Sequence, residues 1–149
     1  MGQQQLLLLV LATVIVGLAT VAGIQAFDQG QSQAANDALT QRAVSIASDI
    51  QGQANKPSQL GGLPDPNDSS SNYGSGTSTE DVANAIGFDS DTGIEAGGAG
   101  DGAQCDIIIQ NSNPAVQCAG GNAETSVTAE VTGLESGDIE TSFGDVASL

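Results

Sequence analysis

The run from Leu6 to Ile24 comprises 19 consecutive residues without one charged side chain. Ala26 and Phe27 prolong this apolar character up to Asp28, the first charged residue of the chain. As an α-helix the run is about 30 Å long, which matches the hydrocarbon thickness of a bilayer. A helix that is apolar on every side needs lipid or other apolar helices around it. This requirement limits the fold more than any other feature of the sequence.

Three interpretations of residues 1–27 are open. A cleaved secretory signal normally begins with a basic stretch, and no basic residue precedes this run. A permanent single-pass membrane anchor is the second interpretation. In the third, the helix is first a membrane anchor and later the core of a filament. The filament core is then made by its large apolar side chains, namely Leu6, Leu9, Leu11, Ile15, Leu18 and Ile24.

Residues 28–56 predict an amphipathic continuation of the same helix. Gly30 weakens the junction by roughly 1 kcal/mol relative to alanine without forbidding continuity. Helix-breaking residues arrive together from Gly52 and Pro57 onwards. We therefore expect one helix of about 50 residues, apolar in its first half and amphipathic in its second. Its narrow apolar stripe repeats at steps of three and four, and comprises Ala35, Leu39, Ala43, Ile46 and Ile50.

The rest of the chain divides by composition into two regions. Residues 57–103 are rich in Gly, Ser and Pro and predict loops, with a short helix from Thr79 to Ile86. Residues 104–149 predict three or four antiparallel strands, the first two joined by a turn at residues 111–114. One face of this sheet is apolar, and the helical stripe is its natural cover. The expected fold class is α+β, a long N-terminal helix packed on a small C-terminal antiparallel sheet.

The charge balance excludes several classes of function. The chain has 18 acidic and two basic residues, for a net charge of −16. Such a surface repels nucleic acid, because nothing neutralises the phosphates. Its self-repulsion favours a high-salt habitat, and an acidic surface protein at ordinary salt is the alternative. Histidine is absent, and no nucleophile–base pair, phosphate loop or dinucleotide motif is present. We therefore expect neither an enzyme nor a bound cofactor.

Three smaller features are weighed separately. Cys105 and Cys118 form a disulfide if the chain is exported, or two free thiols if it stays in a reducing compartment. Asn67 begins an Asn-Asp-Ser triplet, which is a candidate glycosylation site. Residues 89–95 alternate carboxylates like a calcium loop but lack the third acidic ligand and the bidentate glutamate, so we favour a solvated acidic turn and no metal site.

The apolar N-terminal helix, its amphipathic continuation and the small C-terminal sheet together resemble a type IV pilin. The resemblance implies that Met1 is the mature N-terminus and is N-methylated, and that Cys105 and Cys118 close a C-terminal disulfide loop. Two departures from the family pattern are visible. Gln5 stands where the family has a glutamate, so assembly depends more on packing, and the helix contains no proline.

The expected function is that of a structural subunit of an extracellular type IV pilus-like filament. The resemblance implies three partners: further copies of the same chain in a helical homopolymer, the cytoplasmic membrane before assembly, and a pilus assembly machinery. The alternative is a single-pass, membrane-anchored extracytoplasmic domain that does not polymerise.

Overall fold

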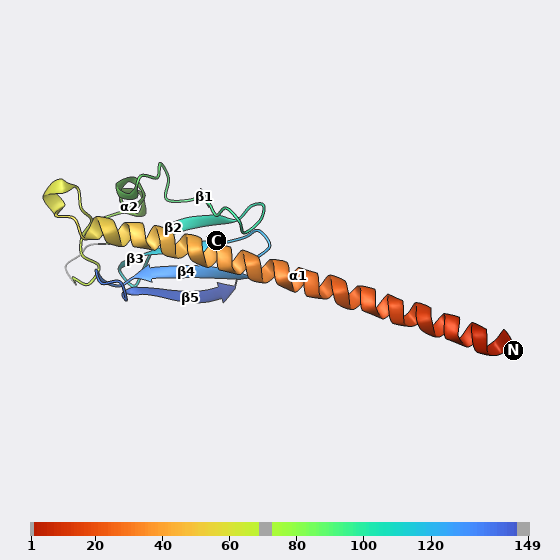
Figure 1. Cartoon of the computed structure of the whole chain (residues 1–149). Helices are drawn as coiled ribbons and strands as arrows, with labels where there is room; N and C mark the ends of the chain where they lie inside the picture. Colours follow the sequence, from red (N-terminus) through yellow and green to blue (C-terminus); the bar gives the residue numbers. More distant parts are fainter. Residues whose placement is uncertain (1, 69–72, 146–149) are drawn as a thin grey trace.

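One helix, α1 (Gly2–Ala54), dominates the computed structural model, which describes residues 2–68 and 73–145. Its 53 residues give a rod about 80 Å long. The second half of α1 lies on a sheet, and the first half projects beyond it (Figure 1). The predicted single helix is confirmed, and Gly30 lies inside it without interrupting it.

The sheet is an antiparallel meander whose five strands follow the chain order β1-β2-β3-β4-β5. Four of them lie within residues 104–149, as the sequence predicted. The remaining strand, β1, has two residues and lies in the region predicted as loops, where its Ile94 pairs with Cys105 of β2. The strands are β1 (Ile94–Glu95), β2 (Gln104–Gln110), β3 (Asn113–Ala119), β4 (Thr125–Val131) and β5 (Ile139–Asp145).

The turn between β2 and β3 is tighter than predicted. Only Asn111 and Ser112 form it, with φ values of 51° and 67°, as in a two-residue hairpin turn. Pro114, predicted to lie in the turn, is in β3 opposite Ile109. Its missing N–H is tolerated because the ladder between β3 and β4 ends at Ala115.

The predicted stripe of α1 covers the sheet, which confirms the α+β fold. None of its five residues is more than 3% exposed, and Ala47 and Ala54 extend the buried face. The helix lies mainly over β3 and β4 (Figure 1). Five apolar side chains on the covered face of these two strands are fully buried: Val116, Cys118, Val127, Ala129 and Val131.

Phe143 departs from the expected pattern of burial. It lies directly opposite the buried Val127 and therefore on the helix-facing side of the sheet, yet 63% of it is exposed. A helix about 10 Å wide covers about two strands spaced 4.8 Å apart, so the edge strand β5 lies outside its reach.

The connecting region contains two short helices, η1 (Ser58–Leu60) and α2 (Thr79–Ile86). The predicted helix from Thr79 to Ile86 is confirmed, and a capping box between Ser78 and Asp81 begins it. The hydrogen bonds that Asp81 accepts from the backbone and the hydroxyl of Ser78 hold the pKa of its carboxyl below the usual range.

Candidate assembly helix

The projecting part of α1, residues 2–31, is called the arm below. Every residue of the arm is exposed, whereas Ala35 and Leu39 further along the same helix are buried by the sheet. The arm is about 45 Å long. The described residues thus form a compact head, from residue 32 onwards, and an arm that none of the head covers (Figure 1).

The six predicted filament-core residues all lie on the arm, and each exposes between 52% and 68% of its surface. They do not share one face, because successive helical residues are rotated by about 100° and these six are distributed around the axis. Leu11 and Ile24, for example, point to nearly opposite sides. By length and composition this helix could cross a membrane, and such an arm is consistent with membrane anchoring.

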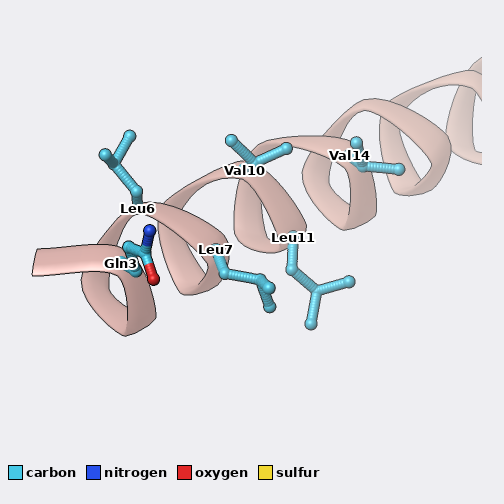
Figure 2. Close-up of a pocket in the computed structure, with 6 residues that line it drawn as sticks. All are labelled: Gln3, Leu6, Leu7, Val10, Leu11 and Val14. Carbon is cyan, nitrogen blue, oxygen red and sulfur yellow. The ribbon is translucent and has the colours of Figure 1, made fainter.

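The surface of the arm has ridges and grooves of the kind through which helices pack together. Figure 2 shows six side chains near its start, with Leu6, Val10 and Val14 on one side and Leu7 and Leu11 on the other. Each set belongs to a row of residues spaced by four, and the two rows border a shallow apolar groove. A groove of this kind accepts a side-chain row of a second helix.

The two threonines within the apolar run of the arm are internally satisfied. The Thr13 hydroxyl donates to the carbonyl oxygen of Val10 at 2.8 Å, and the Thr20 hydroxyl donates to that of Val16 at 2.9 Å. These bonds remove the cost of placing a free hydroxyl in apolar surroundings. Both threonines are therefore compatible with lipid or with a helical bundle.

Two positions of the pilin resemblance, Met1 and Gln5, belong to the beginning of the sequence. Gln5 is exposed in the first turns of α1. Met1, the expected N-methylated terminus, lies outside the described residues, so that expectation stays a prediction.

Cys105 and Cys118 form a disulfide, so the alternative of two free thiols is wrong. The two residues are directly opposite in β2 and β3, and neither is exposed. They belong to one row across the helix-facing side of the sheet, between Ile94 of β1 and Val127 of β4. The bond therefore joins two strands in the core beneath α1.

The remaining sequence candidates lie on loops of the head. Asn67 is exposed, and its N–H donates to the Asp65 carboxylate at 2.9 Å, while the last residue of its triplet, Ser69, lies outside the described residues. In the acidic stretch 89–95, the carboxylate of Asp91 accepts a hydrogen bond from the Thr79 hydroxyl. Among residues 2–68 and 73–145, no three acidic or cysteine side chains gather as a metal site requires.

Gln51, which sequence analysis did not single out, is a buried polar residue that joins α1 to the head. The Gln51 side chain is 8% exposed, and its amide donates to the carbonyl oxygens of Gly133 at 2.9 Å and Glu135 at 2.7 Å. It thereby holds the turn between β4 and β5 against the helix. The available signal was its position beside Ile50 at the end of the apolar stripe, where a long amide side chain lies at the edge of the core.

The comparisons with known proteins give no relative: no protein-family model, curated protein or solved structure matches this chain.

Proposed function

We propose that this chain is the structural subunit of an extracellular filament similar to a type IV pilus, and that it polymerises through its arm. The observation that carries the proposal is the division of one continuous helix into two environments. Its second half is buried against the head, while residues 2–31 are exposed, and within them the uncharged run from Leu6 to Phe27 is apolar around the helix. An arm of this kind stays in water only at a large hydrophobic cost.

During assembly, each arm leaves the lipid bilayer and packs against the arms of other copies. Both environments are apolar, so the gain on leaving the bilayer comes from side-chain packing and close approach of helices. The grooves between rows of leucine and valine support packing of this kind, and Gly17 and Gly23 have open space at their Cα atoms for a neighbouring helix. Gln5 adds no charge to this core, which agrees with assembly by packing.

The head suits the outside of such a filament. Its disulfide is typical of oxidising, extracytoplasmic compartments. All charged side chains follow residue 27, so the surface of the head is strongly acidic and the arm up to Phe27 is uncharged. In the proposed filament the arms form the axis, and the heads form a soluble outer layer that repels nucleic acid.

A non-polymerising anchored domain is the second candidate, because the same length and hydropathy fit a single membrane span. The two candidates differ in what happens to the protein outside the membrane. A filament subunit is released by shear as fibres, whereas an anchored domain stays in the membrane fraction.

The proposal is tested with a charge placed in the arm. Leu9→Asp should abolish filaments, since an uncompensated carboxylate in an apolar bundle costs several kcal/mol. Leu9→Met is the apolar control, and Gln104→Glu adds the same charge to an exposed position of the head. Both controls should assemble like the wild type in the sheared fraction. Normal fibres from Leu9→Asp contradict the proposal.

A further inference from the structure

The two basic residues, Arg42 and Lys56, have no carboxylate partner among the described residues of their own chain, although the chain has 18 acidic residues. The Arg42 guanidinium lies 5.8 Å from the centre of the Phe88 ring. Its Nε atom is buried without a hydrogen-bond partner. Lys56 is exposed, just after the end of α1. Lys56 is therefore free to pair with carboxylates of another molecule, while the half-buried Arg42 adds positive charge to the same side of the head.

Both cations lie on one side of the head, here called the α2 flank. Phe88, which Arg42 contacts, follows α2 directly, and Lys56 borders a shallow groove together with Ile86 of α2. The Gln53 side-chain amide, which borders the same groove, donates to the carbonyl oxygen of Ala85 and so fixes α2 against α1. The α2 flank also carries acidic residues, among them Asp49 and Glu80.

The opposite side of the head is the β5 edge, comprising residues 132–145. Figure 1 shows α2 and β5 at opposite edges of the sheet. The β5 edge has no basic residue, and its acidic residues include Glu135 and the exposed Glu140. It also carries Phe143, 63% exposed, which is one of two large apolar side chains outside the arm that are exposed in the described part of the chain.

Charge restricts how two heads can meet. A head-to-head contact that leaves out residues 42 and 56 contains no basic side chain, so the carboxylates that it brings together repel one another. A contact between the α2 flank of one copy and the β5 edge of the next is different. It places the unpaired cations against carboxylates and covers Phe143.

We propose that neighbouring heads make this heterologous contact in the filament, with the α2 flank of one copy, which carries Arg42 and Lys56, against the β5 edge of the next, which carries Glu140 and Phe143. The two surfaces differ, so the contact repeats from copy to copy and generates an open helical array when it does not close into a ring. This inference rests on the proposed filament function, and it adds a second interface outside the core of arms.

A charge exchange tests the contact in full-length protein, with sheared filament yield as the readout at the lowest salt at which the wild type assembles. Lys56→Glu should reduce the yield by about fivefold or more, because an attractive pair becomes repulsive at every contact. Adding Glu140→Lys should restore it. The matched control adds Asp101→Lys, at an exposed loop position elsewhere on the head, and gives the same net charge without rescue.

The possible outcomes separate the two proposals. Selective rescue by Glu140→Lys supports the contact. Equal rescue by both double variants overturns it, because only the net charge then matters, and wild-type yield from Lys56→Glu alone also overturns it while leaving the filament intact. Phe143→Ser should lower the yield without changing head stability, and an unchanged yield again contradicts the contact. Absence of fibres from the wild type refutes the filament function itself.

Discussion

Replacing leucine by alanine should strongly lower the stability of the head at one position of α1 and leave it nearly unchanged at another. Leu39 is fully buried between the helix and the sheet, whereas Leu11 lies in the arm and is 52% exposed. Leu39→Ala removes about three methylene-sized groups, worth about 2.4 kcal/mol of burial. The cavity left behind raises the loss to about 3–4 kcal/mol. Leu11→Ala removes the same atoms from a site that contacts no part of the head.

The assay is thermal unfolding of the full chain in detergent, followed by the fluorescence of Tyr73. This is the single tyrosine of a chain without tryptophan, and it is buried in the head, so it reports on the head alone. Leu39→Ala should lower the midpoint by at least about 12 °C, and Leu11→Ala should change the stability by less than about 0.5 kcal/mol. An unchanged midpoint for Leu39→Ala, or an equal loss in both variants, refutes the division of α1 into a packed half and a free arm.

Two further properties of the head are open to measurement. Replacing Cys105 and Cys118 by serine should cost about 3 kcal/mol, as for other disulfides that close short loops, and denaturant unfolding equal to that of the oxidised wild type contradicts this. Burial, and secondarily the nearby Asp65 carboxylate, raise the pKa of Tyr73 to about 12. The neutral phenol is favoured in the folded head, so this contribution to stability is complete below pH of about 10 and is lost as the pH rises through 12. Ultraviolet absorbance titration measures it directly, and ionisation near pH 10 in a folded head disproves it.

Periodicity predicted the large elements of the fold because each has one dominant environment. The uncharged run of the arm and the stripe from Ala35 to Ile50 both indicate a helix, and alternation in residues 125–131 indicates a strand with one wet face. The sheet needs cover and the stripe supplies it, so their packing follows from the same pattern. The structure confirms this arrangement.

The features that sequence analysis missed depend on geometry that periodicity does not encode. The strand β1 has two residues, too few to show alternation. The turn at Asn111 and Ser112 requires left-handed backbone at a serine, which no turn preference predicts strongly. The exposure of Phe143 follows from the width of one helix relative to five strands, and the role of Gln51 follows from where the chain returns after β4.

The candidate site was predictable in part for a similar reason. An all-apolar helix is visible in the sequence, and so are the six residues proposed for the filament core. Whether the rest of the chain covers that helix depends on tertiary structure. In the described residues, the head leaves residues 2–31 exposed. The lack of a carboxylate partner for Arg42 and Lys56 among the described residues is also a tertiary property, because the sequence does not show which side chains lie beside them.

The most direct test of the filament proposal is electron microscopy of material gently sheared from cells, combined with N-terminal and intact mass analysis. We expect thin fibres made of this chain, with bundled arms along the axis and heads outside. The mass should also report methylation of Met1 and any sugar on Asn67. Protein that stays in the membrane fraction without forming fibres contradicts the account and favours a single-pass anchored domain.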